Sequence, residues 1–304
     1  MVAKIILGDA GLLSPGRWRW GRALLWLCLL AAVCIVAFNV AADASLHVLA
    51  MAVGEEFTTR AAAPPGARLI AVCIGSMAML GTYALAIHIV ERRSTPEIGL
   101  RSMVPDMASG IALGGALMAT IIGLLWCVDW VVITPKPVTH MVESLKQTIQ
   151  SAVIEEVLVR IIVFRLLWRA TGVFPALILT ALLFGGLHLS NPDASVFSSL
   201  CLVAGEGIGA GLYMITGRVW MAIGMHAGWN FAQGWVFGSA VSGLDVFAGG
   251  PLQTTPVDGV AVILSGGGFG PESSIIALFV SLIASGLFLG IAWRKGRFAA
   301  ITVD

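Results

Sequence analysis

Eight apolar runs of helix length divide the sequence. A hydrocarbon core of about 30 Å is crossed by about 20 mostly apolar residues in a helix. The chain has 304 residues, of which 58% are hydrophobic and only 12% charged, with a mean hydropathy of +0.93, whereas a soluble domain carries about 25% charged residues. We therefore predict an all-α fold, a polytopic membrane helix bundle of about eight transmembrane helices. The runs cover residues 23–42, 69–90, 107–128, 148–169, 174–188, 197–215, 219–237 and 275–293.

The basic residues between the runs predict the orientation of the bundle. Cytoplasmic loops of membrane proteins are enriched in Lys and Arg, and an even number of spans places both chain ends on one side. Thirteen basic residues then flank the spans on the side of the chain ends, and four flank them on the other side. Both termini are therefore predicted to be cytoplasmic. The four outer residues are Arg60, Arg68, Lys136 and Lys146.

No repeat of fixed period and no second domain can be recognised, so residues 1–304 are expected to form a single transmembrane domain. We expect a multi-pass protein of the cell membrane, the inner membrane if the cell is Gram-negative. The sequence A-A-D-A at 41–44 resembles a signal-peptidase site. Because the 22 residues before the apolar core are long for a signal peptide, we expect the first span to be retained.

Composition also excludes some classes of partner. The formal net charge is +1, and no basic block stands apart from the helix flanks, so we expect no nucleic-acid partner. All five cysteines fall in or at the end of apolar runs without a C-x-x-C pair, which is typical of small core residues rather than of a disulfide framework. Membrane lipid is the expected surrounding.

The run from Thr148 to Arg169 carries charges in its middle. Ionisable groups at bilayer depth are costly unless they face a cavity or a partner, so Glu155, Glu156 and Arg160 indicate a functional site. Glu156 and Arg160 stand four residues apart on one helix face and can form an ion pair, whereas Glu155 points about 100° away. The alternative is a helix buried in a soluble core with the charges as one satisfied network.

Three more polar residues lie in later apolar runs. His188 ends the fifth run, and His226 and Asn230 share one face of the seventh run at a spacing of four. A carboxylate and a neutral imidazole facing one cavity can take a proton from water, or hold a metal that activates it. A second imidazole and a carboxamide can donate hydrogen bonds to an oxyanion. Together these groups predict a hydrolase.

Two of the polar residues have alternative interpretations. A single histidine in a membrane helix, such as His226, is also explained as a packed donor to a backbone carbonyl. Glu206, in the sixth run, matches no catalytic spacing. We leave open whether Glu206 forms a structural pair, for which Arg160 is the candidate, or faces the cavity.

The three motifs together resemble a known family. Glu155-Glu156-Val-Leu-Val-Arg160, Phe184-x-x-x-His188 and His226-x-x-x-Asn230 are similar, within residues 148–235, to the signature of the CPBP family of intramembrane proteases. This family includes type II CAAX prenyl proteases and bacteriocin-processing or immunity proteins. The resemblance implies that Glu155 activates a water with His188, that His226 and Asn230 stabilise the oxyanion, and that Glu156 and Arg160 form the supporting pair.

The resemblance leaves the cofactor undecided, because the family has been described both as metalloproteases and as metal-independent glutamate proteases. If a divalent metal such as zinc is used, Glu155, His188 and His226 are its candidate ligands. Two histidines, a glutamate and an asparagine are poor ligands for tight zinc binding compared with H-E-x-x-H.

We therefore expect an intramembrane endopeptidase. Its expected substrate is a membrane-embedded or membrane-anchored protein or peptide, of which a prenylated CAAX-type protein is one case. One alternative is a proton-coupled transporter in which the glutamates and histidines relay protons. Transporters of that kind usually show two similar halves, whereas every polar intramembrane group here lies after residue 150. A catalytically idle membrane immunity or partner protein is the other alternative.

The hydrolase interpretation makes a geometric prediction. Glu155, His188, His226 and Asn230 should line one water-accessible cavity, with Glu155 and His188 close enough to share a water roughly 3 Å from each. The first and eighth spans are expected at the periphery. The membrane face to which the cavity opens is not predicted.

Overall fold

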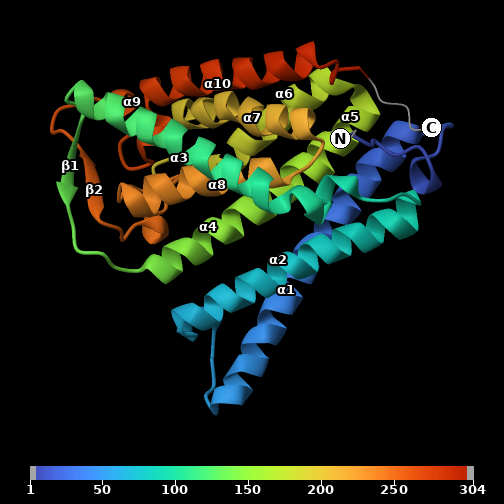
Figure 1. The fold of residues 1–304 in the computed structure, drawn as a ribbon, viewed down its shortest axis with the longest axis horizontal. Coiled ribbons are helices and arrows are strands. Elements are labelled where there is room, and N and C mark those ends of the chain that lie inside the picture. The colour runs from blue at the N-terminus through green and yellow to red at the C-terminus, as the bar shows by residue number, and fades with distance from the viewer. Residues whose placement is uncertain (1–4, 300–304) are drawn as a thin grey trace.

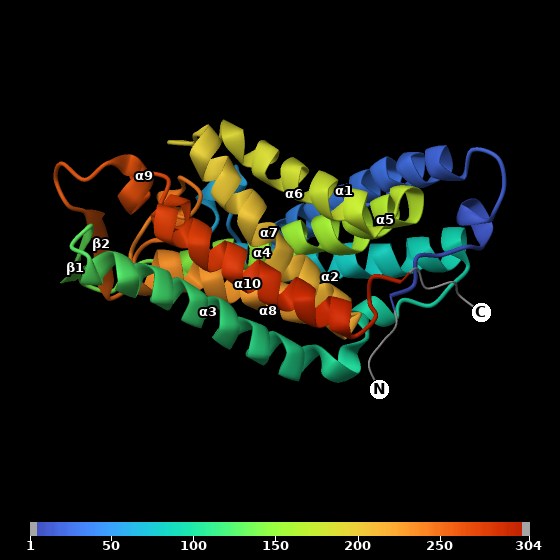
Figure 2. The ribbon, with the colours of Figure 1, turned by 90° about the horizontal axis from the view of Figure 1, so that it is seen from above.

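The computed structural model describes residues 5–299, which form a bundle of helices (Figure 1). Six helices within these residues are long and apolar enough to cross a membrane when their flanking turns are included. The chain is thus a polytopic membrane protein, as predicted. The six are α1 (Arg19–Val53), α2 (Pro65–Ala86), α3 (Met103–Cys127), α6 (Val173–Leu187), α7 (Val196–Thr216) and α10 (Ile275–Arg294). Seen from above, α3 and α10 lie along one edge of the bundle and α6 along the opposite edge (Figure 2).

The other two expected spans are also helical. One is the continuous run of α4 (Met141–Glu156), the π-helical segment η6 (Val157–Phe164) and α5 (Arg165–Thr171), which ends at Gly172. The other is α8 (Trp220–Phe231) followed by the π-helical segment η8 (Ala232–Val236). The first carries Glu155, Glu156 and Arg160, and the second carries His226 and Asn230. Neither is among the six long apolar helices. The count of eight spans and the cytoplasmic position of the termini therefore stay predictions.

Two predicted helix boundaries were wrong. The first span was expected to end at residue 42, but α1 continues to Val53 because the following residues are rich in Ala, Leu and Met, which favour a helix. Gly54 stops it in a left-handed conformation with φ 70°, which glycine adopts at little cost. The helix α4 begins at Met141 rather than at 148. In Figure 1 the hairpin of α1 and α2 projects from one side of the bundle.

A small β-ribbon is the exception to the all-α prediction. The strand β1 (Val131–Pro135) pairs antiparallel with β2 (Leu252–Pro256), with Ile133 opposite Thr254. β-branched residues favour this extended conformation. The ribbon lies at one end of the bundle and α5 at the other (Figure 1). The remaining elements are short: α9 (Val262–Ser265), the π-helical η3 (Ile87–Glu91), and the 3-10 turns η1 (Gly11–Leu13), η2 (Arg60–Ala62), η4 (Pro96–Ile98), η5 (Leu100–Ser102), η7 (His188–Ser190), η9 (Asp245–Phe247) and η10 (Pro271–Ser273).

Glycines bring α3 and α8 into direct backbone contact. Gly110 and Gly114 face Gly224 and Gly228, and each pair has the four-residue spacing that puts both glycines on one helix face. A Cβ added at Gly114 would lie 1.9 Å from the backbone oxygen of Met225. This contact fixes the helix that carries His226 and Asn230 against α3.

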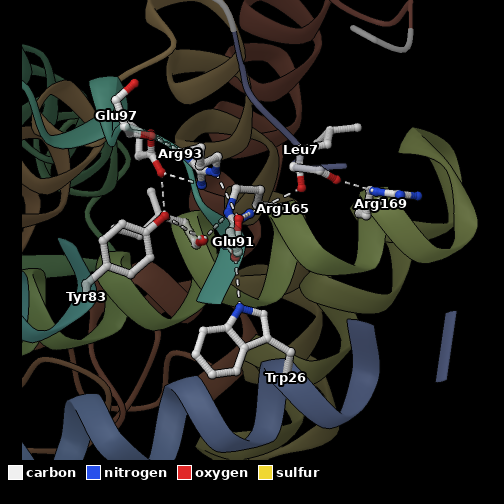
Figure 3. A network of polar contacts seen from close by, with 11 residues as sticks. Leu7, Trp26, Tyr83, Glu91, Arg93, Glu97, Arg165 and Arg169 are labelled. Atoms are coloured by element: carbon white, nitrogen blue, oxygen red, sulfur yellow. Dashed lines mark hydrogen bonds and ion pairs between the residues drawn. The ribbon is translucent and has the colours of Figure 1, made fainter. Parts of the chain in front are cut away.

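A buried polar network lies near α5, at the end of the bundle remote from the ribbon (Figure 3). Glu91 is fully buried and accepts hydrogen bonds from the Trp26 indole at 2.8 Å, from Arg93 at 2.8 Å and from both terminal nitrogens of Arg165 at 2.7 and 2.9 Å. Arg93 also donates to Glu97. Arg165 is one of the thirteen basic residues predicted to flank the spans on the side of the chain ends, but it is fully buried and paired.

The same network holds the segment before α1 against the bundle. Arg165 donates to the carbonyl oxygen of Leu7, and Arg169 donates to those of Gly8 and Leu13 at 2.6 and 2.8 Å. The side chains of Leu7 and Leu13 are buried in the main hydrophobic core. The two arginines therefore join the start of the described chain to α5.

We predict that Gly114→Ala lowers thermal stability whereas Gly123→Ala, on the same helix, does not. The added methyl at Gly114 forces the two backbones apart, and overpacking costs about 1–3 kcal/mol. A Cβ at Gly123 meets nothing within 4 Å, so this variant should gain the ~0.5–1 kcal/mol by which Ala exceeds Gly in a helix. Thermal unfolding of the purified protein in detergent measures both. Equal shifts for the two variants would contradict the proposed packing.

A second comparison tests the buried network. Arg165→Met leaves Glu91 short of its main partner and is expected to destabilise the protein by about 3–5 kcal/mol, as removal of one member of a buried ion pair does. Arg60→Ala serves as control, because the Arg60–Asp43 pair has side chains 44% and 59% exposed and such pairs contribute about 0–1 kcal/mol. Denaturation curves of both variants in the same detergent supply the comparison. A stable Arg165→Met protein would show that Glu91 is held by its remaining donors.

Candidate active site

A cavity of about 270 Å³ lies among α4, η6, α6, α7 and α8 and is bordered by the loop after η8 and by η10. The four residues expected to converge, Glu155, His188, His226 and Asn230, all line it. Their catalytic roles and the shared water stay predictions. Its wall also includes Ser281 of α10, so the eighth span, which was expected at the periphery, contributes one residue to the cavity. The sequence-predicted residues in the cavity wall are Glu155, Glu156, Arg160, His188, Glu206, His226 and Asn230.

Glu155 stands between the two histidines. Its Oε2 atom lies 4.0 Å from Nε2 of His188 and 3.7 Å from Nε2 of His226. The side chain of Glu155 is 30% exposed, compared with 1% for Glu156. Of the two adjacent carboxylates, Glu155 is therefore the one that meets the contents of the cavity, as the 100° difference in direction on a helix predicts.

The ring of His188 is oriented by its own helix. Its Nδ1 lies 2.8 Å from the carbonyl oxygen of Phe184, one turn earlier, and its ring packs on the Phe184 ring with centroids 4.6 Å apart. A carbonyl oxygen only accepts, so Nδ1 carries the proton and Nε2 of the neutral ring presents a lone pair. This lone pair is on the side of Glu155. A water between the two groups can be held by both.

Glu156 and Arg160 form part of a longer chain of charges. Nε of Arg160 donates to Glu156 at 2.7 Å, and the guanidinium also pairs with Glu206 of α7, to which Nη2 donates at 2.9 Å. Glu156 in turn lies 3.0 Å from Nδ1 of His226. Both alternatives considered for Glu206 hold, because it pairs with Arg160 and also lines the cavity.

Asn230 faces the cavity one turn after His226. Its Nδ2 donates to Oγ of Ser151 at 3.1 Å, and the residue is 5% exposed. A carboxamide has two N–H groups, so one remains for a second acceptor. Ser151 was missed by the sequence analysis, although it stands four residues before Glu155 on the same helix face and this spacing was available as a signal.

The helices change geometry where the site lies. The π-helical η6 begins directly after Glu156 and contains Arg160, and the π-helical η8 begins two residues after Asn230. π-Helical geometry within α-helices occurs frequently at functional sites. The loops after α6 and η8 and the turn η10 complete the wall with Asn191, Ser242 and Glu272. The sequence analysis assigned no role to these three residues, because they lie in loops without a periodic pattern.

The histidines and Glu155 were also considered as metal ligands. Among residues 5–299, no group of three or more His, Cys, Asp or Glu side chains is arranged to hold a metal ion. The nearest arrangement is Glu155 with the Nε2 atoms of His188 and His226. As they stand, these side chains do not form a metal ligand set.

Comparison with protein families gives a match to part of the chain. A family model described as "Type II CAAX prenyl endopeptidase Rce1-like" matches residues 137–232, a range that overlaps the motif region 148–235. No curated protein and no solved structure matches the chain. The matched range contains Glu155, His188, His226 and Asn230, and the match supports intramembrane protease activity in general. The match at residues 137–232 therefore supports the resemblance to the CPBP family that the three motifs indicate.

Proposed function

We propose that the protein is an endopeptidase that hydrolyses a peptide bond of a membrane-embedded or membrane-anchored protein or peptide. The observation that carries the proposal is the position of Glu155 between two imidazole Nε2 atoms, at 4.0 and 3.7 Å, in a cavity inside a membrane helix bundle. A carboxylate with room for one water beside it is the arrangement that general-base hydrolysis needs.

In the proposed reaction Glu155 takes a proton from a water that His188 Nε2 also holds. The hydroxide oxygen then forms a bond to the carbonyl carbon of the scissile peptide, and the carbonyl π electrons move to its oxygen. When the tetrahedral intermediate collapses, the C–N bond breaks and Glu155 gives its proton to the departing nitrogen. The atoms balance with one water consumed per bond cleaved.

The oxyanion of this intermediate needs hydrogen-bond donors. His226 and Asn230 supply them, because they stand one helical turn apart on α8 and both line the cavity. Nδ1 of His226 is occupied by Glu156 at 3.0 Å, so the ring donates to the oxyanion through a proton on Nε2. Glu156 is then the counter-ion of that imidazolium. Preorganised donors of this kind are worth about 2.7–4 kcal/mol each.

The expected substrate follows from the position and lining of the cavity. Apolar side chains line it beside the catalytic groups, among them Leu202, Val241 and Phe247, and these suit an apolar stretch on one side of the scissile bond. A prenylated CAAX-type protein is one substrate that such a wall and the family match suggest, and an unmodified membrane peptide is the other. The proposed location is the cell membrane.

We expect Glu155→Gln to abolish cleavage while the protein stays folded and inserted. The change keeps the size and the hydrogen bonding of the side chain but removes the base, which should cost at least the ~10²–10⁴-fold that general-base catalysis contributes. Cleavage of prenylated and unmodified candidate peptides is measured with purified protein at matched amounts, with and without a chelator. Loss of wild-type activity in the chelator would show that a divalent metal takes part.

Glu143→Gln is the matched control for this experiment. Glu143 lies on the same helix and pairs with Arg68 and Lys146 outside the cavity. The same chemical change there should leave the cleavage rate within about twofold, because Glu143 lies outside the cavity and takes no part in the proposed reaction. Normal cleavage by Glu155→Gln would refute the role of Glu155. An inactive wild type would favour the idle membrane protein.

Arg160 is expected to act mainly as a scaffold. Arg160→Ala leaves Glu156 and Glu206 buried without their cation, and removal of one partner of a buried pair costs about 3–5 kcal/mol. The amount of folded protein and its thermal stability should therefore fall together with activity. Arg101→Ala, at an exposed position, is the control. An Arg160→Ala protein with wild-type stability but no activity would make Arg160 a substrate contact instead.

A further inference from the structure

A fourth carboxylate reaches the cavity from outside the matched segment. Glu272 lies in η10, is 5% exposed and lines the cavity wall. Its Oε2 accepts a hydrogen bond from the indole of Trp229 at 3.0 Å, and its Oε1 accepts from the backbone N–H and the hydroxyl of Ser242 at 2.6 and 2.8 Å. Within residues 5–299, Glu272 takes part in no ion pair of 4.0 Å or less. A carboxylate buried without a cation is costly, so these three donors determine where Glu272 sits.

Ser242 occupies an unusual position at the other end of this contact. Its φ is +50°, a region that residues other than glycine seldom adopt and that persists where surrounding contacts enforce it. Both of its backbone polar groups are engaged across the cavity wall. Its N–H donates to Glu272, and its carbonyl oxygen accepts from Nδ2 of Asn191 at 2.9 Å.

These contacts form one continuous chain of hydrogen bonds, Trp229–Glu272–Ser242–Asn191, which we name the Glu272 chain. All four members line the cavity. Trp229 stands three residues after His226 on α8, and Asn191 stands three residues after His188. The Glu272 chain therefore links the two elements that place the histidines on either side of Glu155.

Packing around Asn191 makes this link stiff. The next residue in the Ser242 loop is Gly243 with φ +79°, and a Cβ there would lie 2.0 Å from the carbonyl oxygen of Pro192. The N–H of Gly243 donates to the carbonyl of Phe269 at 2.8 Å. A shift of Ser242 would thus move the segment that follows His188.

We propose that Glu272 is a positioning residue that sets the separation of His188 and His226 through the Glu272 chain. The inference rests on the proposed function, since the two histidines matter for catalysis only in a hydrolase. A charge-recognising role for Glu272 is the competing explanation. In that case the substrate would contact the carboxylate, and the charge of the Glu272 side chain rather than its length would matter.

Two substitutions separate these explanations. Glu272→Gln keeps the length of the side chain. Both carboxylate oxygens of Glu272 accept from N–H donors, so the NH₂ group of the glutamine would face either the Trp229 indole or Ser242, and that hydrogen bond is lost. Glu272→Asp keeps the charge but is one methylene too short to reach both Trp229 and Ser242. If Glu272 positions the histidines, both variants lower kcat by about tenfold to a hundredfold with little change in KM, because a misplacement of about 1 Å can cost ~10² in rate. If it recognises charge, Glu272→Gln alone raises KM.

Hydrogen–deuterium exchange gives a readout that does not depend on activity. We expect Glu272→Gln to speed the exchange of backbone amides in 239–247 and also in 188–194. Asn191→Ala removes only the hydrogen bond from Asn191 to Ser242, and it should speed exchange in 188–194 and lower kcat. This variant tests the proposal if Glu272→Gln does not fold. The control is Ser285→Ala, which removes one buried hydrogen bond, to Ala204 of α7, outside the cavity, and should leave both segments and kcat unchanged.

The results overturn the proposal in two ways. Wild-type exchange in 188–194 for the Glu272→Gln and Asn191→Ala proteins would show that the Glu272 chain does not hold the His188 segment. Wild-type kcat in both variants would show that any motion is irrelevant to the reaction. A wild-type protein that cleaves no substrate would count against the proposed function alone, because the exchange measurement would still report on the Glu272 chain.

Discussion

The burial of Arg160 is the constraint on which the active site depends. A guanidinium stays charged in proteins, and in an apolar bundle it needs carboxylates arranged around it. Glu156 and Glu206 meet this need from two different helices and leave Arg160 only 2% exposed. Because Glu156 also contacts His226, one buried cation fixes the relation of α4, α7 and α8. Glu155, the adjacent residue, is thereby left pointing into the cavity.

A second arginine–carboxylate cluster stabilises the opposite end of the same helix. Arg165 is five residues beyond Arg160, and its guanidinium is fully buried against Glu91 of η3. The helix from Met141 to Thr171 is therefore held through Arg160 to α7 and through Arg165 to the end of α2. Arg160 lies within its π-helical middle, η6, and Arg165 directly follows η6. Two buried charges that need partners therefore hold this segment in place.

The sequence was sufficient for features that repeat along a helix. The spacing of Glu156 and Arg160, and of His226 and Asn230, placed each pair on one face because the helical period is fixed, and hydropathy located the long helices. The loops were different. Glu272 is a single acidic residue in a glycine-rich stretch, and its partners Trp229 and Ser242 are distant in sequence, so no periodicity connects them. The pairing of β1 with β2 was missed for the same reason.

Helix ends could not be predicted from hydropathy either. A hydropathy pattern indicates which residues can contact lipid, but it does not indicate where the helix stops. The end of α1 at Val53 is determined by Gly54 rather than by polarity. The number of spans and the side of the termini are likewise properties of the chain in a bilayer. The number of spans and the side of the termini depend on how the charges are distributed across the membrane, not on helix geometry or side-chain contacts alone.

The attachment of the first residues to α5 has a consequence for how the chain is made. The carbonyl oxygens of Leu7, Gly8 and Leu13 accept hydrogen bonds from Arg165 and Arg169, and these arginines are synthesised more than 150 residues later. The segment before α1 therefore has to wait, with its apolar side chains unburied, while the first three spans enter the membrane. Its docking can mark the point in biosynthesis at which the helix bearing Glu155 has arrived in place.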